Sequence, residues 1–342
     1  MKLAQLICRV STLGLFYFLV FSCNEIDNPV DTEEMPDCFF AIEQQGPFYR
    51  PILHPDEGFV SYYYTPISKV EYPHGPECPG SYIMPQEKSG YWKMDQDGGS
   101  FEKLIDVQLY GESWSPDGKW LAFGAGNLFK MPYIDGVLNV NMIKQLTQTG
   151  WNHHAVWSPN GEWIALNRSL DDNYGPSGIY IMRNDGRGKK HLGRGHNPQW
   201  HPYGEFLVAT LNDDGDHFFL FIDPFNPKKS DYYKKIKREP NASSLRYSYS
   251  PNGEYLAMIL ERQELGSDLW VADENGQNAK RITTKGAERD FTWLDNRHVL
   301  FVTRYSDGGW NTNSGTFFKI DIHTGEKTQI TRLLHEENSI LP

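Results

Sequence analysis

The chain has 342 residues, of which 39% are hydrophobic and 14% aromatic, so we expect a sizeable buried core rather than wholesale disorder. The formal net charge of −11 makes nucleic acid a poor partner, because phosphate contacts require clustered Lys and Arg. The basic run at residues 228–240 is local and favours a solvated outer strand and loop over a patch for polyanions.

The N-terminal segment MKLAQLICRVSTLGLFYFLVFSC is typical of a secretory signal peptide. Lys2 and Arg9 precede an apolar run at residues 10–21, which is shorter than the roughly 20 residues of a membrane-spanning helix. The run stops at Cys23 and resembles a bacterial lipobox, whose Cys carries the lipid and becomes the mature N-terminus. We therefore predict a lipoprotein signal peptide at residues 1–22 and lipidation of the palmitate type at Cys23. The alternative is an ordinary signal peptide with an incidental Cys.

The residues after the lipobox predict a tether. Residues 23–37 are acidic and contain Pro, which is typical of a flexible segment that holds a folded domain away from a membrane. Asn24 stands where some bacteria use Asp for inner-membrane retention. We therefore expect a protein of the cell envelope, anchored in the outer membrane, with the periplasmic and the surface-facing orientation both open.

Two cysteines, Cys38 and Cys78, remain for the folded part in an oxidising compartment. A disulfide between them would close a loop of about 40 residues and stabilise the fold by about 4 kcal/mol in the chain-entropy model. The alternative is two free thiols. Two isolated Cys residues do not have the spacing of a metal site.

A repeat dominates the rest of the chain. Segments such as ESWSPDGKWLAF and AVWSPNGEWIAL align on one aromatic residue, which recurs 43 to 49 positions apart as Trp114, Trp157, Trp200, Tyr249 and Trp293. An earlier copy at residues 52–63 keeps the Pro and Gly without the aromatic. A second apolar strand, a turn and a polar strand follow each copy. Four strands per repeat predict an all-β, six-bladed β-propeller over residues 38–342, to which residues 38–44 could add a closing strand.

The segment WSPDGKWLAF and its copies resemble the repeat of the TolB-like propeller family, a WD40-like arrangement, with six phased copies over roughly residues 50–332. The resemblance implies a six-bladed fold and the docking of protein partners at the mouth of the central channel. In each copy, Pro presets the turn, Asp or Asn tolerates the next position, and Gly accepts positive φ.

The two faces of such a propeller differ in their loops. The turns of the SPDG and NDG type are short and uniform, whereas the connections on the other face vary and include an insertion at residues 65–90. We expect binding on this variable face, because function is usually carried by irregular loops on a rigid scaffold. Trp151, Tyr174 and Trp310 fall in its loops, either as platforms for a sugar ring or protein partner or as packing between loops.

Residues just before each inner strand are expected to surround the channel on the variable face. They are Glu112, His153, His154, His196, Asn197, Arg246, Arg289 and Asp290. The favoured interpretation is a polar lining that bonds water and backbone. The alternative is a metal or acid/base site in which His154 and His196 meet across adjacent blades. No catalytic or cofactor motif stands out, so neither catalytic residues nor a cofactor or resident metal is predicted.

These features favour a lipid-anchored binding or scaffold protein of the cell envelope, with a protein partner as the first choice and a glycan as the second. The alternative is an enzyme. Oligogalacturonate lyases resemble this propeller and use channel-side His with a divalent metal, and their spaced His cluster is not evident in this sequence. A metal-dependent lyase, or another glycan-active enzyme, is therefore the second hypothesis.

Overall fold

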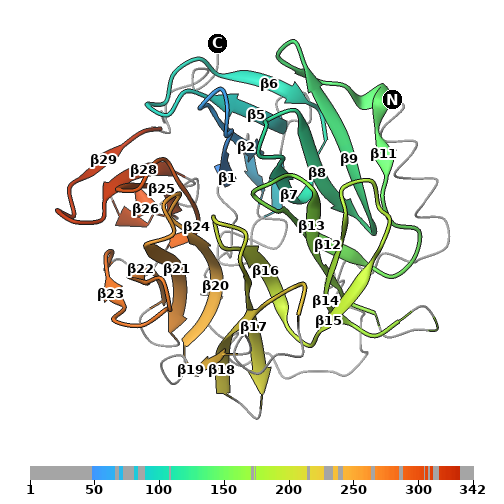
Figure 1. Cartoon of the computed structure of the whole chain (residues 1–342). Helices are drawn as coiled ribbons and strands as arrows, with labels where there is room; N and C mark the ends of the chain where they lie inside the picture. Colours follow the sequence, from blue (N-terminus) through green and yellow to red (C-terminus); the bar gives the residue numbers. More distant parts are fainter. Residues whose placement is uncertain are drawn as a thin grey trace, which may run out of the picture.

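The computed structural model describes residues 48–331 except 66–68, 72–80, 84–88, 108, 171–172, 174, 214–215, 227–233, 238–241, 263–265, 285–287, 304, 307–308 and 311–315. The fold is all-β and confirms the predicted propeller. Six antiparallel sheets surround a central axis in chain order (Figure 1). The signal peptide, the tether, Cys23, Cys38, Cys78 and Tyr174 lie outside the described residues.

In each of the first three blades the strands follow the order of the chain outward from the axis. Blade 1 contains β1 (Phe48–Leu53), β2 (Val60–Tyr64), β5 (Gly90–Met94) and β6 (Glu102–Ile105). Blade 2 contains β7 (Tyr110–Trp114), β8 (Trp120–Ala125), β9 (Asn127–Ile134), β10 (Val137–Leu138), the 3-10 turn η1 (Val140–Met142) and β11 (Lys144–Gln145). Blade 3 contains β12 (Asn152–Trp157), β13 (Trp163–Arg168), β14 (Gly178–Arg183) and β15 (Lys190–Gly193).

The other three blades follow the same plan. Blade 4 contains β16 (His196–Trp200), β17 (Leu207–Asp213), β18 (Asp216–Ile222) and β19 (Lys234–Lys237). Blade 5 contains β20 (Ala242–Tyr249), β21 (Tyr255–Arg262), β22 (Gly266–Asp273) and β23 (Lys280–Arg281). Blade 6 contains β24 (Glu288–Trp293), β25 (His298–Thr303), β28 (Thr316–Asp321) and β29 (Lys327–Gln329).

The repeated turn explains the hairpin between the first two strands of a blade. In blade 2, the Gly118 amide donates to the Ser115 carbonyl over 2.8 Å. The Ser115 hydroxyl donates to Asp117 over 2.6 Å and accepts from the Trp120 amide over 2.9 Å. Gly118 has φ of +67°, which a residue with a side chain rarely adopts. In this blade Ser115 and Asp117 tie the turn together, and Gly118 adopts the conformation that it requires.

The repeated aromatic residue binds each blade to the one before it. Trp114 of blade 2 is buried in a cluster with Phe59 and Tyr63 of blade 1, and Trp293 of blade 6 is buried against Ile259 of blade 5. A buried ring of this size removes 150–250 Å² from water, a gross stabilisation of roughly 4–6 kcal/mol. No single blade could bury its aromatic residue alone, which makes the six blades one cooperative ring.

Side-chain packing between blades 6 and 1 closes the ring. The Phe48 ring on β1 lies 5.4 Å from that of Phe317 on β28. The Leu53 amide donates to the Thr292 hydroxyl over 3.3 Å. Within the described residues, all four strands of blade 6 come from the C-terminal part of the chain. The closing strand considered for residues 38–44 lies outside them.

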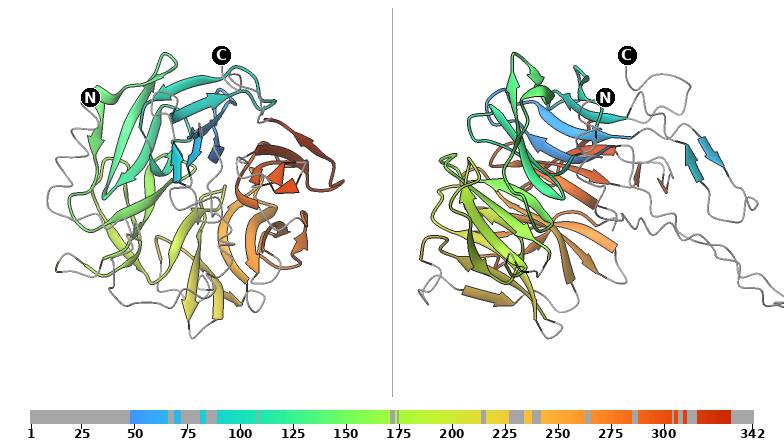
Figure 2. Two further views of the ribbon diagram at one scale, coloured as in Figure 1. Left: turned by 180° about the vertical axis from the view of Figure 1, so that it is seen from behind. Right: turned by 90° about the vertical axis from the view of Figure 1, so that its right-hand side faces the viewer.

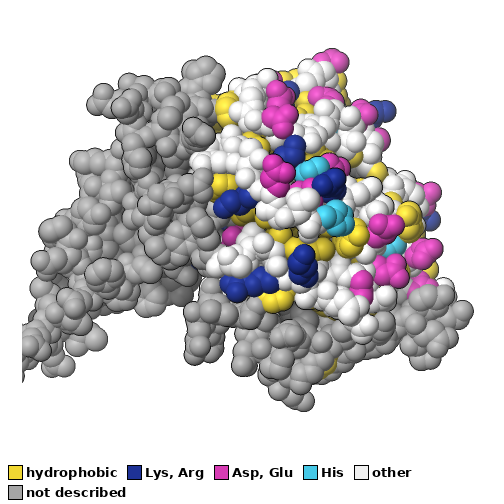
Figure 3. All heavy atoms as spheres, turned by 90° about the vertical axis from the view of Figure 1, so that its left-hand side faces the viewer, with side chains coloured by type: hydrophobic (Ala, Val, Ile, Leu, Met, Phe, Trp, Pro, Cys, Tyr) yellow, Lys and Arg dark blue, Asp and Glu magenta, His cyan; other side chains and the backbone are white. Residues whose placement is uncertain are grey.

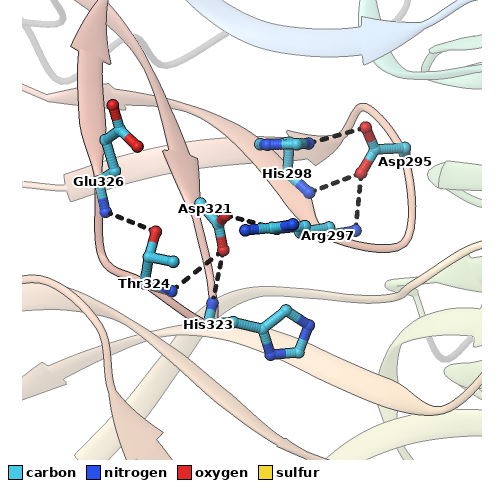
Figure 4. Close-up of polar contacts among 7 residues, drawn as sticks. All are labelled: Asp295, Arg297, His298, Asp321, His323, Thr324 and Glu326. Atoms are coloured by element: carbon cyan, nitrogen blue, oxygen red, sulfur yellow. Dashed lines mark hydrogen bonds and ion pairs between the residues drawn. The ribbon is translucent and has the colours of Figure 1, made fainter.

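The two faces differ as the repeat predicts. Turns between the first and second and between the third and fourth strands share one face, which we call the turn face. Two such turns in blade 6 are joined where Arg297 Nε lies 2.5 Å from Asp321 Oδ2 (Figure 4). Burial opposes ionisation of Asp321, but the amides of His323 and Thr324 and the Arg297 guanidinium hold its pKa at about 2.

The opposite face, the variable face, carries the remaining connections. The insertion after β2 contains a two-stranded hairpin, β3 (Lys69–Glu71) and β4 (Ser81–Ile83), which projects from this face (Figure 2). Blade 6 carries a second one, β26 (Tyr305–Ser306) and β27 (Gly309–Trp310). The sequence predicts irregular loops on this face. At these two places the loops instead contain short strands that pair as antiparallel hairpins.

The outer edge of blades 5 and 6 is polar. Figure 3 shows acidic and basic side chains interspersed over this side of the molecule, with His side chains among them. The strands at this edge, β23 and β29, are short and rich in Lys. Short charged edge strands discourage pairing with other chains. Among the described residues, no helix is long and apolar enough to cross a membrane.

Candidate binding site in the central channel

The innermost strands carry a local irregularity that aims side chains into the channel. In β1, β7, β12 and β16 the pairing with the second strand slips at a bulge. The bulge residue in these strands has φ between 52° and 56°, and these residues are Arg50, Gly111, His154 and Asn197. Strands β20 and β24 contain a shorter slip. A bulge re-aims a side chain without breaking the sheet, which suits a channel lining.

The bulge positions form a ring around the axis. Each lies three residues before the repeated aromatic position, and together with their equivalents in blades 5 and 6 they are Arg50, Gly111, His154, Asn197, Arg246 and Asp290. We call this set the channel ring. Gly111 is required where β7 meets β12, because a Cβ there would lie 2.6 Å from the His154 amide nitrogen. The side chain of the adjacent residue, Glu112, lines the channel cavity in this blade.

A cavity of about 170 Å³ lies inside the inner strands, lined by residues from all six of them. Two ion pairs stand in it. Arg50 Nη1 lies 3.3 Å from Glu112 Oε2, and Arg246 Nη2 lies 3.1 Å from Asp290 Oδ2. The cavity is thus polar and balanced in charge, with two partly exposed guanidinium groups and two largely buried carboxylates.

Burial is the largest influence on the pKa values of the two acidic residues, Glu112 and Asp290. It raises the pKa of the Glu112 carboxyl, and the Arg50 charge opposes that rise. Burial likewise raises the pKa of Asp290 against the attraction of Arg246. Glu112 Oε1 and the neighbouring Ser113 hydroxyl are buried and have no hydrogen-bond partner among the described residues. Both atoms can therefore receive a hydrogen bond from a group that enters the cavity.

His153 and His154, at the start of blade 3, form a neutral pair. His153 Nδ1 and His154 Nδ1 lie 2.5 Å apart, and His153 Nε2 lies 2.5 Å from the Ser169 hydroxyl. Burial, with help from the Arg246 charge, lowers the pKa of His154 to about 3. Burial also lowers the pKa of His153, and His196 adds to the effect. Both rings are therefore uncharged at neutral pH and act as hydrogen-bonding groups.

The remaining predicted residues lie around this cluster. His196 is exposed and Asn197 is half-buried, and the Asn197 amide donates to Asn167 Oδ1 over 2.6 Å. Arg289 is half-buried, and its Nε has no hydrogen-bond partner among the described residues. Trp151, just before β12, is 46% exposed. Trp310 lies in β27, at the start of the blade 6 loop on the variable face.

Sequence reasoning missed two residues. Arg50 belongs to the channel ring and lies over the Tyr110 ring at 5.3 Å. Tyr110 begins β7 at the variable-face end of the channel and is 46% exposed. Counting three positions back from Leu53, which replaces the aromatic in the first copy, would have identified Arg50. Tyr110 stands at the place of His153 and His196 in the next two blades.

The cluster has the chemistry of recognition. Fixed guanidinium and carboxylate groups can bind a partner's charged or amide groups through charge-assisted hydrogen bonds. Within the described part of the chain, no group of three or more His, Cys, Asp or Glu side chains is placed to hold a metal ion. The geometry defines a β-propeller with a polar channel and an aromatic mouth.

Solved structures share this architecture, whereas neither the protein-family models nor the curated proteins match the sequence. TolB from Acinetobacter baumannii has a TM-score of 0.56 and 15% identity over 79% of this chain, which spans 63% of the Acinetobacter protein. A TolB structure from Agrobacterium tumefaciens has a TM-score of 0.52 at 17% identity, covering 68% of this chain and 84% of the other. Hydrazine synthase of Kuenenia stuttgartiensis has a TM-score of 0.53 at 12% identity, covering 83% and 79%. The chain is therefore a six-bladed propeller of the TolB-like fold, a fold that also occurs in a synthase and does not by itself define function.

Proposed function

We propose that this chain is a lipid-anchored binding or scaffold protein of the cell envelope that docks a protein partner at the variable-face mouth of its channel. The observation that carries the proposal is the combination of two exposed aromatic side chains, Tyr110 and Trp151, with the charged channel ring beside them. Aromatic residues and Arg are the residue types that dominate binding energy at protein interfaces.

The arrangement is suited to a protein segment. Tyr110 and Trp151 offer apolar area with little loss of conformational freedom, and Arg50 holds the Tyr110 ring from one side. The unpartnered oxygens of Glu112 and Ser113 can accept hydrogen bonds from backbone or side-chain amides that reach the cavity. A partner that inserts a polar segment into the mouth would satisfy both.

The proposed function includes a lipid anchor that holds the protein at a membrane. Lipidation at Cys23 would hold the propeller at the outer membrane, and residues 23–37 would act as the tether. Incorporation of labelled palmitate tests this part separately. We expect label in the wild-type protein and none in Cys23→Ser, and equal labelling of both forms would contradict the anchor.

Docking is tested by recovering cross-linked partners from the cell envelope. The double variant Tyr110→Ala/Trp151→Ala should recover at least about tenfold less of the partner than the wild type, because two central aromatic anchors are lost. The matched control is Tyr203→Ala, which removes a 68% exposed aromatic side chain from the turn face. The control should recover the partner normally. Equal recovery by all three proteins would refute docking at this mouth.

One observation supports a second candidate function, a metal-dependent lyase of the oligogalacturonate type. His153, His154 and His196 lie near enough at the channel for His196 to lower the pKa of both other rings. Imidazole nitrogens are ordinary ligands of divalent metals. Stoichiometric Mn or Zn in the purified protein, lost in His154→Ala/His196→Ala, would favour the enzyme over the scaffold.

A further inference from the structure

The junctions between blades have a common plan on the turn face. Behind the first turn of blades 1 to 5, the aromatic residue at the start of the second strand packs near the repeated aromatic residue of the next blade. At four junctions an additional ring contacts the first of these two residues. The additional rings are His54 between blades 1 and 2, Phe225 between blades 3 and 4, His201 between blades 4 and 5, and His323 between blades 5 and 6.

These contacts take two forms: His54 and His201 stack on their neighbours, whereas Phe225 and His323 meet theirs edge-on. The His54 ring stacks on Phe59 at 4.4 Å and meets Trp114 edge-on at 4.6 Å. The Phe225 ring lies 5.5 Å from Trp163 and reaches its junction from the third-to-fourth-strand turn of the following blade. The additional ring can thus come from either blade, and it fills the notch between the two aromatic walls.

The junction between blades 2 and 3 lacks such a ring. The first turn of blade 2 supplies Ser115 where His54 stands in blade 1, and the third-to-fourth-strand turn of blade 3 supplies Asn184 and Asp185. A cleft of about 500 Å³ opens there, walled by Trp120 and Trp157 and floored in part by Lys130. We call it the blade 2–3 notch. Its volume lies in the range of small-molecule sites.

The notch contains one buried cationic group, Lys130, and the Asp117 carboxylate also lines it. Lys130, only 8% exposed, places its ammonium 4.6 Å from the Trp120 ring centre and 5.5 Å from that of Trp157. Lys144 pairs directly with Lys130 across β11 and β9, and its ammonium lies 5.0 Å from the Trp120 ring centre. Like charges directly opposite on neighbouring strands repel each other. Among the described residues neither lysine has an ion-pair partner, and the Lys130 ammonium donates only to the Asn184 carbonyl, over 2.6 Å.

The indole N–H of Trp157, one wall of the notch, differs from the N–H groups of its equivalents. Trp200 donates its indole N–H to the Val156 carbonyl over 3.1 Å, and Trp293 donates to the Ser248 carbonyl over 3.0 Å. The equivalent Trp157 is 7% exposed and lines the cleft, but its Nε1 has no hydrogen-bond partner among the described residues. Leaving a buried donor without an acceptor costs free energy.

We propose that the blade 2–3 notch binds a small ligand that carries a planar ring and a carboxylate. The ring takes the place that His54 and His201 occupy at their junctions, between the walls formed by Trp120 and Trp157. The carboxylate accepts hydrogen bonds from Lys130 and neutralises the repulsion between Lys130 and Lys144. This site lies on the turn face, so it is independent of docking at the channel mouth.

The test is a titration of the purified protein with three probes, followed by saturation-transfer NMR. Benzoate carries both parts of the proposed ligand, benzyl alcohol carries the ring, and acetate carries the carboxylate. We expect benzoate to saturate at about 1 mM or below, given its size. Benzyl alcohol and acetate should bind at least about tenfold more weakly, because each lacks one set of contacts.

Two variants locate the binding. Ser115→His places in the notch the ring that blade 1 already carries and should abolish benzoate binding. Lys130→Met keeps the aliphatic stem, removes the charge and should weaken binding at least about tenfold. The control is Lys93→Met, at the equivalent position of blade 1, where Lys93 lies 3.1 Å from Glu102. It should leave benzoate affinity unchanged.

The outcomes separate clearly. Loss of benzoate binding in Ser115→His or Lys130→Met, with retention in Lys93→Met, supports the site. No saturable binding of benzoate to the wild type would overturn it, as would binding that both notch variants leave intact. Benzyl alcohol binding as tightly as benzoate would overturn the requirement for a carboxylate. If Ser115→His fails to fold, Lys130→Met decides the question alone.

Discussion

His54 of blade 1 bonds directly to the turn of blade 2, with its Nε2 3.0 Å from the Gly118 carbonyl oxygen. Its Nδ1 accepts from the Glu57 amide over 3.0 Å, so Nε2 carries the proton and donates to Gly118. His201 repeats the motif between blades 4 and 5 and lies against Gly253. Two junctions of the ring are thus held by a neutral histidine that reaches the glycine of the next turn.

Replacing that glycine should loosen the junction. In Gly118→Ala the new Cβ would lie 2.4 Å from the His54 ring at a φ of +67°. Gly136→Ala is the matched control, since Gly136 has φ of +84° and nothing lies within 4 Å of its Cβ position. We expect the control to cost roughly 1–2 kcal/mol of unfolding free energy from φ strain, and Gly118→Ala to cost at least about 1 kcal/mol more. Equal losses in urea denaturation would contradict the close packing of His54.

The histidine motif also predicts a pH dependence of stability. Burial lowers the pKa of His54 and of His201 below the usual 6.5. The unfolded chain therefore takes up protons first, so this stabilisation is complete above pH 6.5 and is lost as the pH falls below it. Each ring should contribute at most about 1 kcal/mol to the loss between pH 6.5 and 5.5.

Urea denaturation at pH 7.5 and 5.5 measures this effect. His54→Gln/His201→Gln should lose less stability over that interval than the wild type, because glutamine does not titrate. An identical loss in both proteins would assign the acid sensitivity to other groups, such as His154, whose pKa is about 3.

The ion pair between Arg246 and Asp290 in the channel should have a large coupling energy. Arg246→Met leaves the Asp290 carboxylate buried without its partner and should cost about 2–3 kcal/mol, allowing for the partial exposure of Arg246. Adding Asp290→Asn should recover part of that loss in a double-mutant cycle. The same cycle on Arg183 and Glu162, an exposed pair 2.9 Å apart, should give no more than about 1 kcal/mol. Similar coupling energies for both pairs would show that the channel is as well solvated as the surface.

Two equivalent tryptophans should respond differently to the same change. Trp200→Phe removes the hydrogen bond to Val156 and leaves that carbonyl without its donor, whereas the Trp157 indole has no such bond to lose. We expect Trp200→Phe to destabilise the protein by about 1 kcal/mol more than Trp157→Phe. A larger loss in Trp157→Phe would mean that its N–H is bonded in solution.

Much of the fold follows from the repeat itself. A large ring every 43 to 49 residues can be buried only against a neighbouring sheet, so Trp114 and its equivalents predict blades, their order and their number. The uniform Ser-Pro-Asp-Gly turns likewise predict which connections share a face. The hairpin of β3 and β4 escaped notice because three-residue strands leave too short an alternating pattern.

The details of the sites depend on three-dimensional neighbours and could not be inferred as easily. The bulge that aims the channel ring is occupied by Arg50, Gly111, His154 and Asn197, and four different residue types give no common signal. The open notch between blades 2 and 3 is even harder to predict from the sequence. At other junctions the filling ring comes from either blade, so its absence is apparent only when both turns are placed together.

A photo-cross-linking residue placed at position 151, with a second protein carrying it at position 203, tests docking at the variable face most directly. Both positions hold exposed aromatic residues, one beside the channel mouth and one on the turn face. We predict that irradiation of the intact cell envelope gives a discrete protein adduct from position 151 and not from position 203. Adducts from position 203 alone, or the same adducts from both positions, would contradict the proposal.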